Sequence, residues 1–539
     1  MKKHTFWIVV LLLFLTVGGT VSVFYFQNGT EPSKMAVISH KDLEGQQQIV
    51  EEPCPQPVVE CLATTGESTK PLSIQEEIAI LNDPDAIPFL NPFHDGRTIP
   101  LQSPKITSSK TKLGYQVKMN VGSFLTTPTY SDGVLYTSGG FTSREFYALN
   151  AISGKVIWAV DLSDDGPSSA LVLDSTVIFN TESCTIFALD KFSGEQIWAK
   201  WIGDPLLSHP VSDGKLVFTA YPKLMNEPTS AKAEQLKKLA PSHPFAALDV
   251  KTGEVKWQRW LDGDVMTTPV LCGNEIYLTT FTGTIYRLEA KTGKILKAST
   301  LQATSLPTIA GNSIYTTKRL QVKGKVSEAI VELDKRSLRI KRTLLVREAP
   351  YLDSKVQALS LLKDQSSEWD AANGFFFTPD VSGYQKAETL VGQSNISSLQ
   401  NFVGSTVVVD SMYLYSCLGD LVVCLDVRSG GMVWSYPIPR NLKLEGGHLA
   451  TIPMVLDRYL VTSTLEGEIL IINKLDGLLR KSYPTETEVR NQPIVVNGRV
   501  YVTSTDGQIT CVDTKNRKLD GWPMFLKNNA HNCELGSNP

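Results

Sequence analysis

A short recurring phrase constrains the fold of this chain more than any other feature of its sequence. In chain order, the phrase consists of a hydrophobic residue, then Leu, then either Asp or Asn, then any three residues, then Gly, then any three residues, and finally Trp. The four clearest copies are Ala148 to Trp158, Ala188 to Trp198, Ala247 to Trp257 and Cys424 to Trp434. Weaker copies begin at Arg287, Glu332, Ile471 and Cys511. Self-similarity of this kind indicates an array of repeated units that pack against one another.

The Asp-type position of the phrase measures the repeat period. It is occupied by Asn150, Asp190, Asp249, Glu289, Asp334, Asp426, Asn473 and Asp513. The shortest spacing between these positions is 40 residues, and the two longest are 59 and 92. A period of about 40 residues is typical of a four-stranded propeller blade. The positions predict eight units, although the spacing of 92 leaves room for a degenerate ninth.

The segments between the phrases are typical of short β-strands. Alternating runs such as Val134 to Ser138 are separated by Asp-Gly, Asn-Gly or similar turn pairs. We predict four strands per unit, named A to D in chain order, and an all-β, eight-bladed β-propeller over residues 106–533. The early run Tyr115 to Val121 is expected to join the last blade and close the ring, which removes exposed strand edges.

The repeated Gly and Trp have predicted structural roles. The Gly permits a tight C–D turn with a positive φ angle. The Trp is large enough to pack on the neighbouring blade, where its indole N–H needs an acceptor. The predicted blade-docking residues are Trp158, Trp198, Trp257 and Trp434.

The N-terminal region differs in character from the repeats. Residues 1–4 are predicted to form a short cytoplasmic tail, and residues 5–26 an uncharged transmembrane signal-anchor long enough to span a bilayer. The flanking lysines favour a cytoplasmic N-terminus and a propeller in the periplasm or extracellular space. A cleaved signal peptide is the alternative. Residues 27–105 are expected to form a flexible tether, in which a helical run from Ser73 to Leu81 could dock on the propeller.

Charge and cysteine content narrow the possible partners. The net charge is −3, so the chain lacks the basic excess of a nucleic-acid-binding protein. Cys54 and Cys61 lie close together in a polar stretch of an exported chain, which makes a local disulfide plausible. Cys424 and Cys511 occupy a repeat position that Ala fills elsewhere, and we predict small buried residues there.

The phrase resembles the tryptophan-docking repeat of the PQQ-like β-propeller family. The closing segment Gly521 to His531 also resembles a segment common near the ends of such chains. This family contains quinoprotein alcohol dehydrogenases and non-enzymatic BamB-like assembly factors. The resemblance implies an eight-bladed propeller. Within the family, the sequence is most similar in character to the BamB-like members.

Membership of the enzymatic branch of this family would imply a set of active-site residues, which we do not find in this sequence. Its members carry an Asp base, calcium ligands, a Trp platform for the quinone and often a vicinal cysteine pair. No adjacent cysteine pair is present, and no calcium set can be placed in the corresponding segments. No metal-binding cysteine or histidine motif occurs either. We therefore predict no catalytic residues, no cofactor and no metal site.

Departures from the repeat indicate where function lies. Insertions at 221–244 and 347–401 and a long B–C connection from Lys318 to Glu328 fall on the face that carries B–C and D–A connections. Residues just before each A strand should line the mouth of the central channel on this face, either as a ligand site or as a water-filled polar funnel. The candidate binding residues are Thr127, His209, Thr268, His448, Arg490 and Gln492.

These features predict a membrane-anchored, extracytoplasmic scaffold that binds other envelope or membrane proteins through one propeller face. The resemblance adds envelope or outer-membrane protein assembly as a setting. We expect a monomeric propeller. The alternative function is that of a PQQ-dependent oxidoreductase or a small-ligand-binding propeller.

Overall fold

A computed structural model describes the residues from Gly96 to Asn528 with gaps, together with three residues before them and two after. The described ranges are 78–79, 82, 96–120, 122–181, 185–202, 208–220, 243–263, 265, 268–280, 282–349, 405–410, 412–438, 449–528 and 534–535. The chain divides into two compact units, Met1–Lys70 and Pro71–Pro539, and all described residues belong to the second. The predicted tail, anchor and Cys54–Cys61 pair lie outside these ranges, as do most of both insertions.

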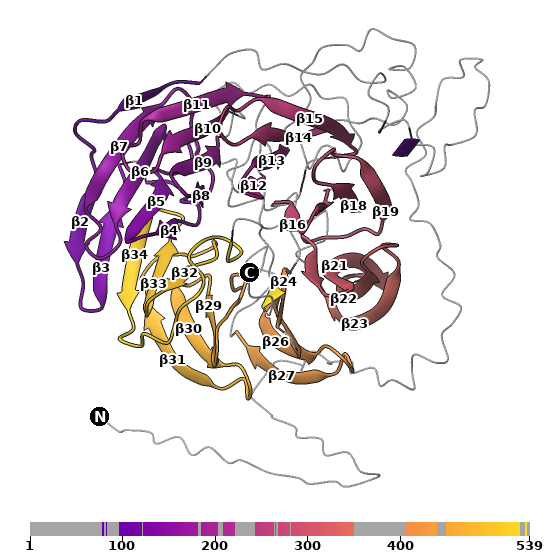
Figure 1. Cartoon of the computed structure of the whole chain (residues 1–539). Helices are drawn as coiled ribbons and strands as arrows, with labels where there is room; N and C mark the ends of the chain where they lie inside the picture. Colours follow the sequence, from indigo (N-terminus) through magenta and orange to yellow (C-terminus); the bar gives the residue numbers. More distant parts are fainter. Residues whose placement is uncertain are drawn as a thin grey trace, which may run out of the picture. The chain divides into compact units, whose positions relative to one another are not determined.

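The predicted all-β propeller is confirmed, with eight sheets arranged around a common centre in the second unit (Figure 1), and the four blade strands of each sheet pair antiparallel. Blade 1 contains β4 (Thr129–Ser131), β5 (Val134–Ser138), β6 (Glu145–Asn150) and β7 (Val156–Leu162). Blade 2 contains β8 (Leu171–Leu173), β9 (Thr176–Asn180), β10 (Thr185–Asp190) and β11 (Gln196–Trp201). Blade 3 contains β12 (Val211–Ser212), β13 (Leu216–Ala220), β14 (His243–Asp249) and β15 (Val255–Leu261). Blade 4 contains β16 (Val270–Cys272), β17 (Glu275–Thr279), β18 (Thr284–Glu289) and β19 (Ile295–Thr300).

The second half of the ring repeats this order. Blade 5 contains β20 (Thr308–Ala310), β21 (Ser313–Val322), β22 (Lys325–Asp334) and β23 (Ile340–Glu348). Blade 6 contains β24 (Val407–Asp410), β25 (Tyr413–Leu418), β26 (Leu421–Asp426) and β27 (Met432–Pro437). Blade 7 contains β28 (Met454–Val455), β29 (Tyr459–Ser463), β30 (Glu468–Asn473) and β31 (Leu479–Pro484). Blade 8 contains β32 (Ile494–Val496), β33 (Arg499–Thr503) and β34 (Gln508–Asp513), and its fourth strand is β3 (Gly114–Lys118).

Ring closure comes from the N-terminal side of the chain. Strand β3 pairs antiparallel with β34, with Tyr115 opposite Cys511, and the first strands β32 and β4 are in contact. The closing strand was predicted from Tyr115 to Val121. In the structure it begins one residue earlier and ends three residues earlier. All eight Asp-type positions end the third strand of their blade, so the sequence period and the blade period coincide.

Two further N-terminal strands cover outer blade edges. Strand β1 (Thr98–Pro100) pairs with β7, and β2 (Thr107–Lys110) pairs with β3. Strand β1 thus lies within the region predicted as tether. Of the helical run predicted from Ser73, the structure describes only Ile78 and Ala79, which are helical. Beside them, the Asn82 side chain donates to Ile295 O at 3.1 Å and accepts from Ile295 N at 2.8 Å.

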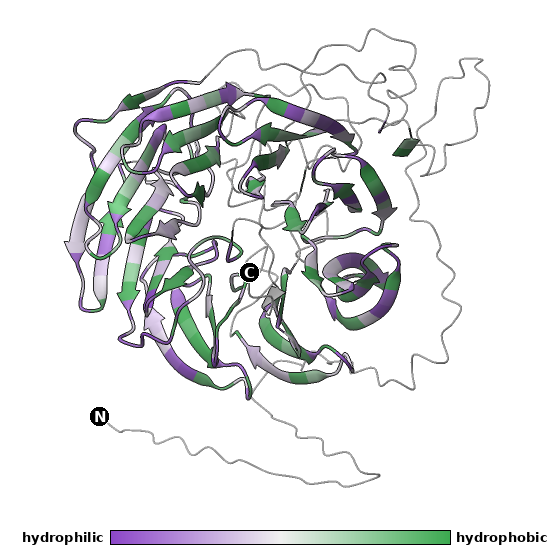
Figure 2. Ribbon diagram, in the orientation of Figure 1, coloured by the Kyte–Doolittle hydropathy of each residue, from purple (hydrophilic) through white to green (hydrophobic). Residues whose placement is uncertain are grey.

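Burial depends on the place of each strand within its blade. Second and third strands are almost wholly buried, whereas the outer strand β31 is mostly exposed. Figure 2 shows the hydrophobic residues concentrated in the middle strands of the sheets. The thiols of Cys424 and Cys511 are buried in this interior, and burial raises the pKa of each to about 12. Both are small buried residues, as the repeat pattern predicted.

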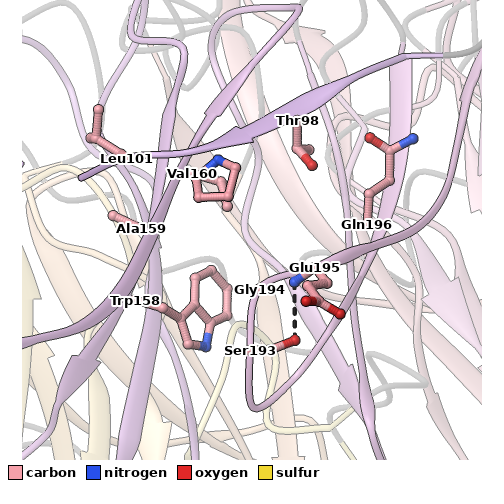
Figure 3. Close-up of a pocket in the computed structure, with 10 residues that line it drawn as sticks. Thr98, Leu101, Trp158, Ala159, Val160, Ser193, Gly194, Glu195 and Gln196 are labelled. Atoms are coloured by element: carbon pink, nitrogen blue, oxygen red, sulfur yellow. Dashed lines mark hydrogen bonds between the residues drawn. The ribbon is translucent and has the colours of Figure 1, made fainter.

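Each repeat Trp packs on the Gly of the next blade's C–D turn. The indole nitrogens of Trp158, Trp198, Trp257 and Trp434 donate to Lys191 O, Val250 O, Ala290 O and Lys474 O at 2.8–3.1 Å. A Cβ atom on Gly194, which has φ +76°, would lie 2.7 Å from the ring of Trp158 (Figure 3). The Gly therefore provides both the turn conformation and the flat surface that receives the indole.

The long B–C connection predicted in unit five is a strand hairpin. Strands β21 and β22 each contain ten residues and pair along their whole length, from Ser313 opposite Asp334 to Val322 opposite Lys325. The turn uses Lys323 and Gly324, with φ +52° and +74°. Positive φ angles at both central residues match the twist of a two-residue hairpin. We call residues 318–328 the blade 5 hairpin.

Candidate functional site

B–C and D–A connections share one face of the propeller, as strand alternation predicted. Asp164, just after β7 of blade 1, accepts hydrogen bonds of 2.6 Å from Thr181 and Thr185, which flank the B–C turn of blade 2. Asp262 repeats this contact after blade 3, with the hydroxyls of Thr280, Thr282 and Thr284 of blade 4 at 2.6–2.8 Å. We call this side the D–A/B–C face.

Polar side chains at the mouth of the channel bind the backbone of neighbouring blades. Thr127 Oγ1 donates to Gln492 O at 2.8 Å, which links blade 1 to blade 8. Thr268 Oγ1 donates to His209 O at 2.9 Å, which links blade 4 to blade 3. The side chains of Thr127, Thr268 and Gln492 are all buried. The structure thus brings four of the six candidate residues together as two inter-blade pairs.

The chain's own C-terminal part enters the channel beside these residues. We call residues 522–528 the channel segment. Trp522 exchanges backbone hydrogen bonds with Val495 of blade 8, at 2.8 and 3.0 Å. Its indole nitrogen donates to Val455 O of blade 7 at 3.0 Å, and Pro523 O accepts from Tyr130 N of blade 1 at 2.6 Å. Because the segment runs antiparallel to β32, it heads toward the D–A/B–C face.

Two candidate residues contact the channel segment directly. Gln492 Oε1 accepts a hydrogen bond of 2.9 Å from Leu526 N. The Phe525 ring lies 4.9 Å from the His209 ring, measured between centroids, at an interplanar angle of 60°. Leu526 is fully buried, and Phe525 is 7% exposed. The mouth differs from an open polar funnel on this side, because apolar side chains of the same chain occupy it.

His209 is held in its neutral form by this environment. Burial lowers the pKa of the imidazole from 6.5 to about 4, because a charged ring would be poorly solvated beside Phe525. Its Nδ1 atom is buried and has no hydrogen-bond partner among the described residues, and the same holds for Gln492 Nε2. Ser169 Oγ, just before β8, is also buried without a partner among the described residues, so unused hydrogen-bonding capacity occurs at several points of the mouth.

The two remaining candidates are Arg490 and His448. Arg490 Nε lies 2.6 Å from Glu488 Oε1, so the guanidinium is paired within its own D–A connection. His448 lies outside the described residues. No group of three His, Cys, Asp or Glu side chains suited to a metal ion occurs in the ranges that the structure describes.

A buried carboxylate that the sequence did not single out lies near the same face. Glu328 is fully buried on β22. Its Oε1 accepts from Ser405 N at 2.7 Å and from Thr304 Oγ1 at 3.3 Å, and its Oε2 accepts from Ser405 Oγ at 2.9 Å. These bonds fix the root of the blade 5 hairpin against blade 6. The pairing partner Ser405 follows Glu328 by 77 residues, so no local sequence signal reveals the contact.

The quinone cofactor that the enzymatic branch would imply does not fit the described channel. Such a cofactor needs an open pocket with an aromatic floor and carboxylate groups that hold its metal. Phe525 and Leu526 take up this space, and the polar groups beside them are hydroxyls, amides and a neutral imidazole. The mouth is therefore arranged to hold a peptide segment of its own chain.

A cavity of about 360 Å³ lies away from the channel, between the outer strands of blades 1 and 2. Figure 3 shows Trp158 and the turn Ser193 to Gln196 on its wall. Ser193 bonds its own turn, and Gln196 Nε2 donates to Gly96 O at 2.9 Å. Two of its polar side chains are thus engaged in hydrogen bonds within the chain.

Three curated relatives are each similar to about a third of the chain. Outer membrane protein assembly factor BamB of Shewanella oneidensis is 25% identical over 168 residues, which make up 31% of this chain and 42% of the relative. The factor of the same name from Salmonella typhimurium is 26% identical over 235 residues, 35% of this chain and 59% of the relative. Tetrathionate hydrolase of Acidithiobacillus ferrooxidans is 26% identical over 192 residues, 32% of this chain and 36% of the enzyme. The chain thus spans less than two thirds of the length of these relatives.

A family-level match covers much more of the chain. Residues 107–218, 239–337 and 392–523 match the family described as outer membrane protein assembly factor BamB. These segments contain all eight Asp-type positions and all four docking tryptophans, so the match follows the blades. Since they make up more than half of the chain, this protein belongs to the PQQ-like propeller family that carries the BamB description.

Proposed function

We propose that this protein is a scaffold for protein–protein interaction in the cell envelope, in the assembly of outer-membrane proteins, and that it binds its partners through the D–A/B–C face. Membrane attachment through residues 5–26 and a periplasmic or extracellular propeller form part of this proposal. Its partners would be other envelope or membrane proteins.

One observation carries the proposal: the channel segment fills the mouth of the ring with its own apolar side chains. The space where a propeller could hold a small molecule is thus used for internal packing. The surface that remains is formed by the connections of the D–A/B–C face, where the repeat is most interrupted. Loops positioned by a rigid scaffold are common binding surfaces.

Site-specific photo-cross-linking tests this assignment. A photoreactive residue would replace Lys323 or Glu486, which are exposed on the D–A/B–C face, or Phe192 or Leu475, which are 70% and 66% exposed on C–D turns. We expect discrete adducts with envelope proteins from the first pair and none from the second. Adducts from the C–D positions alone would overturn the choice of face.

A loss-of-function experiment tests the assembly role. Replacing residues 222–241 by a short Gly-Ser linker leaves β13 and β14 intact and shortens the connection between them. We expect the host that carries this variant to accumulate less folded outer-membrane protein than the host with the full chain. Equal amounts of folded protein in a host that lacks the gene altogether would rule out the assembly role.

The oxidoreductase alternative predicts a different result. A purified PQQ enzyme would show quinone absorbance and dye-coupled alcohol oxidation. Truncation of the channel segment would leave both signals in place, because it only opens space in the channel. We expect no such signals from the purified chain, because Phe525 and Leu526 occupy the channel.

A further inference from the structure

Charge is distributed unevenly over the blades. The whole chain has a net charge of −3. Blade 5, from Thr308 to Glu348, contains ten Lys and Arg residues but only four Asp and Glu residues. The remainder of the chain therefore carries a net negative charge, although residues 97–118 are also positive, with five Lys and Arg residues and no Asp or Glu.

Blade 5 also projects beyond its neighbours on the D–A/B–C face. Its second and third strands contain ten residues each, whereas the corresponding strands β17 and β18 of blade 4 contain five and six. The additional pairs form the blade 5 hairpin. Gln321, Lys323 and Lys325 are exposed near its tip.

Several cationic side chains of blade 5 form ion pairs within the propeller. The cationic side chains of the hairpin form fewer and more exposed ion pairs. Arg342 pairs with Glu332 at 2.5 Å, and Arg347 pairs with Asp420. Lys325 lies 2.9 Å from Glu348, but these side chains are 66% and 45% exposed. An exposed ion pair of this kind contributes little to stability, at most about 1 kcal/mol. Lys318, Arg319 and Lys323 form no ion pair with any residue that the structure describes.

The hairpin has a fixed base. Glu328 binds Ser405 and Thr304 at its root, and Arg319 and Arg347 lie opposite Glu328 on the two adjacent strands. Leu320 and Val326 pack against the main hydrophobic core. A rigid, basic projection of this kind loses little conformational freedom when it binds a partner.

We infer that the blade 5 hairpin is a docking surface for an acidic, extended segment of a partner protein. This inference rests on the proposed scaffold function and names the chemistry of the partner. A short acidic segment would meet only the positive hairpin, so opposite charges would speed association. An anionic membrane surface would also approach the acidic remainder of the chain, which it would repel.

Charge reversal at the tip, with a matched control, tests the inference. The test variant of the full chain is Lys323→Asp with Lys325→Glu; Asp suits the positive φ at position 323 better than Glu does. The control is Arg336→Glu with Arg339→Glu, which makes the same change of net charge on exposed C–D turn positions of the same blade. The probes are a labelled Glu-rich peptide, a Gln-rich peptide of equal length and phosphatidylglycerol vesicles.

We expect the full chain to bind the Glu-rich peptide and not the Gln-rich one, with affinity falling as salt rises. The tip variant should bind it about tenfold more weakly or worse, and the control should bind as the unmodified chain does. Equal weakening in both variants, binding of both peptides alike, or binding of vesicles without the Glu-rich peptide would each overturn the inference.

Photo-cross-linking separates this inference from the proposed function. Adducts from Glu486 that persist in the tip variant, together with unchanged peptide binding, would remove the hairpin as the docking surface but leave the scaffold function in place. Absence of adducts from every position of the D–A/B–C face would instead contradict the scaffold function itself.

Discussion

At the scale of single residues, the contact between Trp198 and Gly253 shows how one blade recognises the next. We expect Trp198→Ala to lower the free energy of unfolding by about 3–5 kcal/mol, because it removes a large buried side chain. Trp198→Phe should cost less, since it mainly leaves Val250 O without its donor. Gly253→Ala should also destabilise, because a Cβ would lie 2.7 Å from the indole at φ +69°. Denaturant unfolding measures all three, and equal stability of the Ala and Phe variants would contradict a packing role for the indole.

His209 gives a second prediction at this scale. Its folded pKa of about 4 lies below the ordinary value of 6.5, so the unfolded chain binds more protons between these values. Stability contributed by the neutral ring is therefore complete above pH 6.5 and falls as the pH decreases toward 4, by roughly 3 kcal/mol. We expect His209→Gln to lose less stability than the unmodified chain between pH 7 and 4.5 in urea titrations. Parallel losses in both proteins would show that His209 does not titrate in this way.

Trp522 shows the limit of reading single residues from the repeat. The last copy of the phrase predicts a Trp at the end of an outer strand, but Trp522 lies at the inner strands and donates to Val455 O. The outer position of blade 8 is filled by β3. The place of Trp522 thus depends on which strand closes the ring.

At the scale of elements, closure of blade 8 depends on the approach of β3 to β34. Gly114 lies opposite Val512, and a Cβ there would collide with the carbonyl oxygen of Cys511. We expect Gly114→Ala to lower stability by a few kcal/mol and to speed hydrogen exchange in β3 and β34. Gly431→Ala is the matched control, because the nearest atom to its Cβ is the Ser429 hydroxyl at 3.3 Å. Slow exchange in β3 of the Gly114 variant would mean that closure tolerates the added methyl group.

Elements were predictable where their signal was local. Alternation and turn pairs predicted the strands, and the Asp-type positions predicted where third strands end. The blade 5 hairpin was expected as a loop, because its ten-residue strands exceed the repeat length and their pairing depends on a turn at Lys323 and Gly324. The edge strand β1 was missed for a related reason: its partner β7 lies some 60 residues later in the chain.

At the scale of the whole molecule, the sequence predicted the ring but not what fills it. Eight units of about 40 residues suit a closed propeller. The contents of the channel depend on contacts between distant residues, such as Leu526 with Gln492 and Phe525 with His209. Such contacts leave no periodic trace. The inter-blade bonds of Thr127 and Thr268, which lie just before first strands, are likewise visible only in three dimensions.

The channel segment gives the last prediction, because it connects blades that are not neighbours. It contacts blades 7, 8, 1 and 3, and β35 (Glu534–Leu535) pairs with β24 of blade 6. Removing residues 521–539 would expose the sites of Trp522, Phe525 and Leu526, each worth about 1.5–3 kcal/mol of burial. We therefore expect a clearly lower Tm and faster hydrogen exchange around Gln492. Removing only residues 529–539 is the control, since it keeps the contacts of Trp522, Phe525 and Leu526 described above and should leave most of the stability. If both truncations unfold at the temperature of the full chain, the ring is stable without its central segment, and the channel would then be a space that a ligand can enter.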